Sequence, residues 1–387
     1  MIYLDNAATT RVDPKVFDEM YSYFCENYAN AYSIHSFGVL IREKVELFRK
    51  LIADYFNCKQ NQIIFTSGAT ESNNWVIKQM EEKLDTITCP HLNHIITTKI
   101  EHDSILNACK SIEENCRVDY LDVDSNGTVN IEQLKGYLEY DSTYIPKSKI
   151  LVSVMTANNE IGTIQPIKEI GSLCKKYGAK FHTDATQAIS TMGIDVVESN
   201  LDFLSCSAHK FYGPKGIGIL YIKEPSEVHP ILFGGEQEMN LRAGTTNSPA
   251  IIGMGEAICL LQKEKEDIQK IKYIRDSFVN KVLTEIPDCQ LNGSLENRVV
   301  GNANICFRGL HGAESLLMLL DMDGIIASSG SACNSSSLDP SHVLKAIGMS
   351  DEDAKNSIRF SFGKYNTIDE IDFIVESLKK NVGLLRG

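Results

Sequence analysis

The feature that most constrains the fold is an alternation of short apolar runs with helix-like stretches between about residues 60 and 222. Each run is apolar almost throughout, which is typical of strands buried on both faces of a parallel sheet. The pattern therefore predicts an α/β fold whose ligands bind at the carboxyl ends of the strands. The predicted strands are Ile63–Thr66, His94–Thr98, Lys149–Met155, Lys180–Thr183, Phe203–Ser207 and Gly216–Ile222.

The rest of the chain shows a second organisation. Apolar residues recur at steps of three or four within residues 253–285, which predicts one long amphipathic helix. A strand near Ala303–Phe307 and a helix near Glu314–Leu320 follow it. Because 387 residues suit two packed units, we predict a large domain with a mostly parallel sheet and a smaller α/β domain. The large domain would span 15–255, and the smaller one would combine 1–14 with 256–387.

Composition narrows the class of protein. The chain is 43% hydrophobic and 23% charged, which are ordinary values for a globular protein. Its formal net charge of −13 and its lack of a Lys/Arg-rich run disfavour binding to nucleic acid or to an anionic membrane. The N-terminal sequence does not read as a signal peptide, and no apolar run is long enough to span a bilayer. We therefore expect a cytoplasmic protein.

The 11 cysteines do not have the spacing of metal ligands, and we expect mostly free, buried thiols such as Cys174 and Cys306. Asp122, Asp124, Asn126 and Gly127 match the opening of an EF-hand loop. The twelfth position is Gln133 where a bidentate glutamate is needed, and the preceding flank reads as a strand. No metal site is predicted.

Two segments carry features of a phosphate site. Thr66–Ser72 leads from a strand into a helix through small residues, so its backbone N–H groups could cradle an anion at the helix N-terminus. The alternative is an ordinary capped helix start after a tight turn. Ser205–Lys210 leads from a strand into a Gly/Pro-rich loop, where Lys210 could form a Schiff base beside phosphate donors Ser207 and His209. The alternative there is a solvated lysine near a turn.

Two further strand ends carry chemical groups. Asp184 could pair with a protonated pyridine nitrogen, with Gln187 near the phenolic oxygen of the same ring; equally, Asp184 could cap the next helix. His102, just after the strand at 94–98, could stack on a planar cofactor and move protons, or it could be structural.

A run of small polar residues surrounds one cysteine. Ser328–Ser337 has Cys333 in its middle, where we expect an exposed thiol, and exposed thiols are reactive when deprotonated. A loop of this kind could carry sulfur from an active site to the surface. A linker with an incidental cysteine is the alternative.

Together these segments resemble the cysteine desulfurases of the NifS/IscS type, over nearly the whole chain. Seven motifs occur in the family's order: Tyr3–Thr10, Thr66–Asn73, Ala157–Gly162, His209-Lys210, Arg242–Thr245, Ser328–Cys333 and Ile358–Ser361. The resemblance implies fold type I of the pyridoxal 5′-phosphate (PLP) enzymes and a homodimer.

The resemblance also implies roles for individual residues. Lys210 would bind PLP covalently and Asp184 would bind the pyridinium nitrogen, with Gln187 and Asn159 near the 3-oxygen. His102 would stack on the ring. Arg359 would grip the substrate carboxylate, assisted by Asn159, in a bidentate contact suited to guanidinium. The phosphate would be held by Ala69, Thr70, Ser207, His209 and, from the partner subunit, Thr245.

The implied reaction converts L-cysteine to alanine and leaves the sulfur as a persulfide on Cys333. The persulfide would pass to an acceptor protein for iron–sulfur cluster assembly or for thiolation of tRNA or a cofactor. The residues after Cys333 resemble the long-loop class of the family, which passes sulfur directly to scaffold proteins.

Two other functions remain open from the sequence. An aminotransferase or selenocysteine lyase of the same fold type would share Lys210 and Asp184, although transamination needs no thiol such as Cys333. A non-catalytic protein that handles sulfur or metal is the alternative from a different class, and it would bind no PLP.

Overall fold

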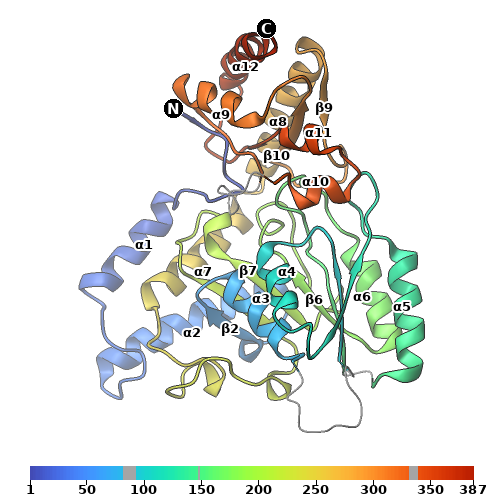
Figure 1. Ribbon diagram of the computed structural model, residues 1–387. Coiled ribbons are helices and arrows are strands. Elements are labelled where there is room, and N and C mark those ends of the chain that lie inside the picture. Colours follow the sequence, from blue (N-terminus) through green and yellow to red (C-terminus); the bar gives the residue numbers. More distant parts are fainter. Residues whose placement is uncertain (82–92, 147–148, 331–338) are drawn as a thin grey trace.

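The computed structural model describes residues 1–81, 93–146, 149–330 and 339–387 (Figure 1). Within them, the larger sheet has seven strands in the order β2-β8-β7-β6-β5-β3-β4. Strand β8 is antiparallel to β2 and β7, and the other neighbours are parallel, which confirms the mostly parallel α/β prediction. The strands are β2 (Ile63–Thr66), β3 (His94–Thr98), β4 (Arg117–Leu121), β5 (Ile150–Ser153), β6 (Lys180–Asp184), β7 (Phe203–Ser207) and β8 (Gly218–Ile222).

The sheet is buried on both faces, as its apolar runs predicted. Ile63 packs in one hydrophobic cluster and its neighbour Ile64 in another, because successive side chains point to opposite faces. Helices α3 (Ala69–Lys78) and α4 (Asp103–Lys110) cover one face. The other face is covered by α1 (Pro14–Cys25), α2 (Ser36–Phe56), α5 (Ile131–Tyr144), α6 (Ile167–Tyr177) and α7 (Ser248–Lys263).

A second core lies above the carboxyl ends of the large sheet in Figure 1. It is built on a three-stranded antiparallel sheet, and Leu4 near the N-terminus packs in it. The short strands β1 (Ile2–Tyr3) and β11 (Ile325–Ile326) pair in parallel beside it. Its other elements are α8 (Glu266–Glu285), β9 (Cys289–Leu291), β10 (Asn302–Phe307), α9 (Ala313–Met322), β12 (Ser357–Ser361) and α12 (Glu370–Arg386).

The prediction of one helix over 253–285 was wrong. The chain forms two helices, α7 and α8, with a break at Glu264, which has φ −99° and ψ 43°. Helix α7 packs against the large sheet and α8 against the small one, so the chain must turn between the two cores. The charged residues at the break have no apolar side to bury, and Glu264 instead pairs with Lys15 and Lys364.

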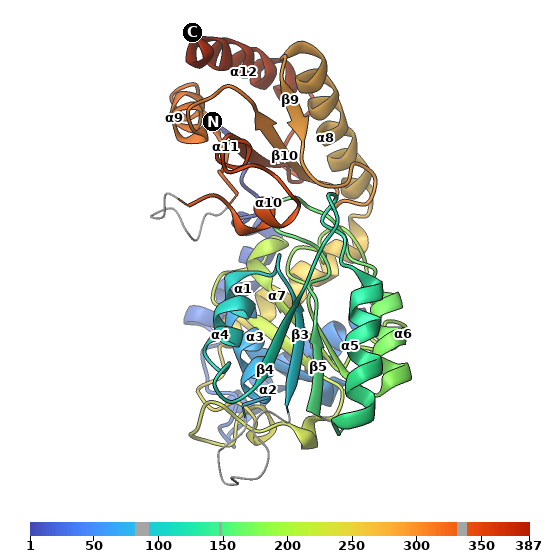
Figure 2. The same cartoon turned by 45° about the vertical axis from the view of Figure 1, so that its right-hand side comes forward.

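Two short helices join the cores on the side facing the viewer in Figure 2, α10 (His342–Ala346) and α11 (Asp351–Lys355). Val343 and Leu344 of α10 pack with Ile100 and Ile161, which follow β3 and β5. Among the described residues, no helix combines the length and the apolar character that a membrane span requires. Cys174 and Cys306 are buried free thiols, as predicted.

Candidate active site

A cavity of about 310 Å³ lies where the carboxyl ends of the large sheet meet the second core. Its volume is within the range of small-molecule sites. The walls bring together residues from nine separate stretches of chain. They include most of the residues that the sequence predicted for the site. These are Ala69, Thr70, His102, Asn159, Asp184, Gln187, Ser207, His209, Lys210 and Arg359.

Asp184 is the last residue of β6 and is 7% exposed. Asn73 on α3 donates to its Oδ2 at 2.7 Å, and the backbone N–H of Thr186 donates to its Oδ1 at 2.9 Å. Two donors thus fix the carboxylate against the wall of the cavity. Beneath it, burial lowers the pKa of His182 to about 4, so this imidazole is neutral at pH 7.

The N-terminus of α3 forms an open cup next to the end of β7. Gly68 precedes the helix and provides no side-chain cap, and the N–H of Ala69 donates to Ser207 Oγ at 2.7 Å. A Cβ on Gly218 would lie 2.7 Å from Gly68 Cα and 2.4 Å from the carbonyl oxygen of Cys206. Only glycine allows this close backbone approach, which brings the helix N-terminus to the strand end. Such an arrangement suits an anion.

Lys210 ends a short 3₁₀ turn, Ala208–Lys210, that follows β7. Its Nζ donates to the carbonyl oxygens of Ala7 and Ala8, each at 2.7 Å, and Gln187 donates to Ala7 at 2.9 Å. The amine is therefore held inside the cavity by the N-terminal segment. Burial, with smaller effects from Lys210 and Lys215, lowers the pKa of His209 to about 4.

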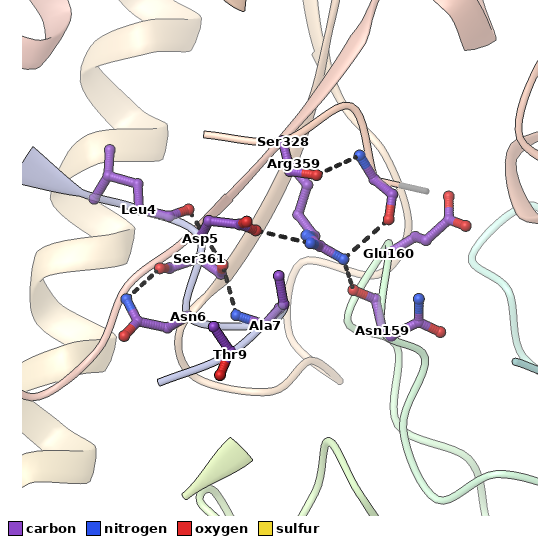
Figure 3. Close-up of polar contacts among 12 residues, drawn as sticks. Leu4, Asp5, Asn6, Ala7, Thr9, Asn159, Glu160, Ser328, Arg359 and Ser361 are labelled. Carbon is purple, nitrogen blue, oxygen red and sulfur yellow. Dashed lines mark hydrogen bonds and ion pairs between the residues drawn. The ribbon is translucent and has the colours of Figure 1, made fainter. Parts of the chain in front are cut away.

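Arg359 on β12 is 2% exposed and connects separate parts of the chain (Figure 3). Its Nη2 donates to Asp5 at 2.9 Å, and its Nη1 donates to the carbonyl oxygens of Asn159 and Gly330 at 2.9 and 3.0 Å. Its buried Nε has no hydrogen-bond partner among the described residues. A guanidinium fixed at the cavity wall is a suitable binder for a carboxylate.

His102 caps the start of α4, where its Nδ1 accepts from the N–H of Ser104 at 3.1 Å. The His102 residue also lines the cavity, at the end of the loop between β3 and α4. His102 therefore both caps a helix, as the structural interpretation predicts, and lines the cavity, as the cofactor-facing interpretation predicts.

Two predicted site residues do not appear in this cavity. Thr245 is exposed, lies in the segment before α7 and does not line the cavity. Cys333 lies outside the described residues. Among the described residues, no group of three or more His, Cys, Asp or Glu side chains is arranged to hold a metal ion.

The structure adds functional positions that the sequence argument named only as parts of motifs. Asn73 fixes Asp184, the carbonyls of Ala7 and Ala8 hold Lys210, and Glu160 lines the cavity next to Asn159. The signal for Asn73 was available, since it lies four residues after Ala69 on the same face of α3.

Comparison with known proteins agrees with this geometry. The aminotransferase class-V family model matches residues 2–374. The cysteine desulfurase IscS of Clostridium botulinum is 45% identical over 383 residues, covering 98% of this chain and 94% of that protein. A solved structure named NifS-like protein matches with TM-score 0.89 and 34% identity, covering 99% of this chain and all of that one.

The chain belongs to the cysteine desulfurases of the class-V aminotransferase family. A further solved structure, SspA in complex with cysteine, matches with TM-score 0.79 and 32% identity, over 95% of this chain and 100% of that one. Enzymes of this family use PLP, which is therefore the cofactor of this cysteine desulfurase.

The cavity fits PLP on its own geometry. The uncapped start of α3 and Ser207 offer donors to a phosphate, and the fixed carboxylate of Asp184 suits a protonated ring nitrogen. The Lys210 amine lies in the same cavity. The buried Oγ1 of Thr186 also lines it and has no partner among the described residues. The donors at α3, the Asp184 carboxylate and the Lys210 amine thus match the phosphate, the ring nitrogen and the aldehyde carbon of PLP.

The close approach of Gly218 to Gly68 predicts the effect of a single methyl group. Gly218→Ala should lower the free energy of unfolding by about 1–3 kcal/mol, because the new Cβ meets only backbone atoms that cannot move aside. It should also weaken retention of PLP on dialysis, because the α3 N-terminus must shift. Urea unfolding and cofactor absorbance measure the two effects.

Gly136→Ala is the matched control for this prediction. Gly136 is an exposed position within α5, and an added Cβ there meets nothing within 4 Å. This substitution should stabilise the protein by about 0.5–1 kcal/mol and leave PLP retention unchanged. Equal effects of the two substitutions would contradict the close-approach argument.

Proposed function

We propose that this cysteine desulfurase converts L-cysteine to L-alanine and receives the sulfur as a persulfide on Cys333. The observation that supports it most is the meeting of the Lys210 amine, the Asp184 carboxylate and the Arg359 guanidinium in one cavity. A lysine and a carboxylate suit PLP, and the guanidinium suits the carboxylate of an amino acid.

The residues that would hold PLP fall into three groups. Lys210 would anchor the cofactor through its amine, and Asp184 would face the ring nitrogen. Gln187 and Asn159 would lie near the 3-oxygen, with His102 against the ring. The phosphate would be bound by Ala69, Thr70, Ser207, His209 and Thr245 of the partner subunit.

When bound, PLP supplies an acceptor for the electrons released at the substrate α-carbon. Arg359 and Asn159 bind the substrate carboxylate and so orient the α-carbon and the sulfur. The freed amine of Lys210 takes the α-proton, and His102 is positioned to move a proton in the same cavity.

The sulfur step requires a thiolate. The Cys333 thiolate attacks the substrate sulfur, a sulfur–sulfur bond forms, and the carbon–sulfur bond breaks with its electron pair staying on the carbon fragment. Protonation of that fragment gives alanine. The persulfide on Cys333 splits one difficult transfer into two easier ones.

The persulfide would then pass to a sulfur-acceptor protein, for iron–sulfur cluster assembly or for thiolation of tRNA or a cofactor. We propose that the enzyme acts in the cytoplasm. Neither contact with a membrane nor direct binding of nucleic acid is part of the proposed reaction.

An exposed apolar surface supports the proposed homodimer. Helices α1 and α2 and the segment between them expose Phe17, Tyr21, Phe24, Tyr28 and Leu40. Patches of this kind on a folded protein mark interaction sites. Both helices pack on α7, the helix that begins just after Thr245. A second copy covering this surface would therefore lie against the two helices that pack on α7.

The reaction is tested by alanine release from L-cysteine with PLP and a reductant. Cys333→Ala should bind PLP and cysteine normally but release alanine at least about 100-fold more slowly, because the attacking thiolate is gone. Lys210→Ala should lose both the covalently bound PLP and the activity. Alanine release by Cys333→Ala at the wild-type rate would contradict the sulfur step.

The dimer is tested by adding charge to the exposed surface. Tyr21→Asp combined with Phe24→Asp should convert a dimer into monomers in light scattering and weaken PLP binding, because Thr245 of the partner is lost. Phe373→Asp on α12, which is equally exposed, is the control and should remain dimeric. A wild-type protein that is monomeric at micromolar concentration would contradict the proposed homodimer.

A further inference from the structure

Glu160 is a buried carboxyl group at the wall of the active-site cavity that the proposed reaction does not use. It follows Asn159 in the loop after β5 and is 2% exposed. Its backbone is fixed on both sides, since its N–H donates to Asn158 and its carbonyl accepts from the amides of Asn302 and Asn304. The side chain is therefore held in a defined place.

One oxygen of this carboxyl group hydrogen-bonds the chain after residues 331–338 and lies close to the chain before them. Ser341 Oγ lies 2.5 Å from Glu160 Oε2. A Cβ built on Gly330 would lie 3.1 Å from the same atom. Cys333 belongs to the stretch of sequence between Gly330 and Ser341.

The hydrogen bonds of Ser341 fix the direction of this contact. Its hydroxyl oxygen accepts from the N–H groups of Val343 and Leu344 at the start of α10. A hydroxyl has one donor and two acceptor positions, so its proton must point to Glu160 Oε2. Glu160 thus acts as an acceptor here. Burial raises the pKa of the Glu160 carboxyl, opposed by the Ser341 hydrogen bond.

The same contacts lead to the guanidinium that binds the substrate carboxylate in the proposed reaction. Arg359 Nη1 donates to the carbonyl of Asn159, which precedes Glu160 in the sequence (Figure 3). It also donates to the carbonyl of Gly330, which lies close to the Glu160 carboxyl group. Gly330 has φ +99°, a backbone conformation that glycine adopts readily. Glu160, Gly330, Ser341 and Arg359 form one connected group.

We propose that Glu160 is a positioning residue that, through Ser341, fixes the chain after the Cys333-bearing stretch relative to Arg359. This inference rests on the proposed function. Arg359 places the substrate sulfur and Glu160 places the chain that delivers the thiol, so the attack depends on both. Reactions between two held groups lose rate steeply when either is displaced.

The first test compares Glu160→Ala with Glu160→Gln in the PLP-loaded enzyme. Glu160→Ala should lower kcat for alanine release by about 10- to 100-fold, because the Cys333 stretch is no longer anchored. The half-saturating cysteine concentration, read from cofactor absorbance, should change by less than about threefold, because Arg359 still binds the substrate. Glu160→Gln keeps an acceptor oxygen and should recover kcat to within about threefold of wild type.

The second test removes the hydroxyl partner. Ser341→Ala should lower kcat in the same direction as Glu160→Ala, and the double variant should be no slower than the worse single variant, because the two residues act through one contact. Ser350→Ala is the matched control. Ser350 likewise caps a short helix, α11, through a bond from Asp353 N, but it lies away from this group. It should leave kcat unchanged.

Several results would overturn the inference. If Glu160→Gln is as slow as Glu160→Ala, Glu160 acts through its charge or proton. If only the half-saturating cysteine concentration rises, Glu160 acts on substrate binding. If Glu160→Ala does not fold, Glu160→Gln and Ser341→Ala decide the matter, and a wild-type kcat in Ser341→Ala refutes the anchoring. A wild type that releases no alanine contradicts the proposed function itself, and the same assay shows this first.

Discussion

The burial of the Arg359 guanidinium is the interaction on which the rest of the site depends. A buried charge is costly unless its hydrogen-bond donors are satisfied, so the chain must bring partners to it. Asp5 supplies the opposite charge from the N-terminal segment, and Asn159 and Gly330 supply carbonyls. These contacts bring β12, the N-terminal segment and the loop after β5 to one place. The cavity between the two cores is the result.

The N-terminal segment that pairs with Arg359 also holds the Lys210 amine. With Asp5 held by Arg359, the carbonyls of Ala7 and Ala8 lie against the Lys210 amine. Thr10 donates both its N–H and its hydroxyl to the carbonyl oxygen of His209. The amine is thus held ready in a cavity whose far wall carries Asp184. Distortion at Arg359 would therefore reach the cofactor site as well as the substrate site.

Much of this fold followed from local patterns in the sequence. The strands at 63–66, 94–98 and 203–207 occur where their apolar runs predicted them, because both faces of each strand are buried. The break at Glu264 was not predicted, because it arises from the packing of α7 and α8 on different cores. The sequence puts Asn73 on the same face of α3 as Ala69, but it does not show that Asn73 pairs with Asp184, because the two residues are 111 positions apart.

The burial of individual cysteines depends on tertiary packing as well as on local sequence. Burial raises the pKa of Cys206 in β7 and of Cys174 in α6, so these thiols are poor nucleophiles. Cys25 is exposed on α1 and does not line the cavity. Their surroundings support a packing role for the buried thiols. Gly330, three residues before Cys333 in the sequence, lines the cavity.

The most direct test of the account is to locate the sulfur after one turnover. The PLP-loaded enzyme would be treated with one equivalent of L-cysteine without reductant, then digested and mapped by mass spectrometry. The account predicts one additional sulfur atom on the peptide that contains Cys333, together with an equal amount of alanine. Additional sulfur on another cysteine, or alanine formed without any persulfide on Cys333, would contradict it.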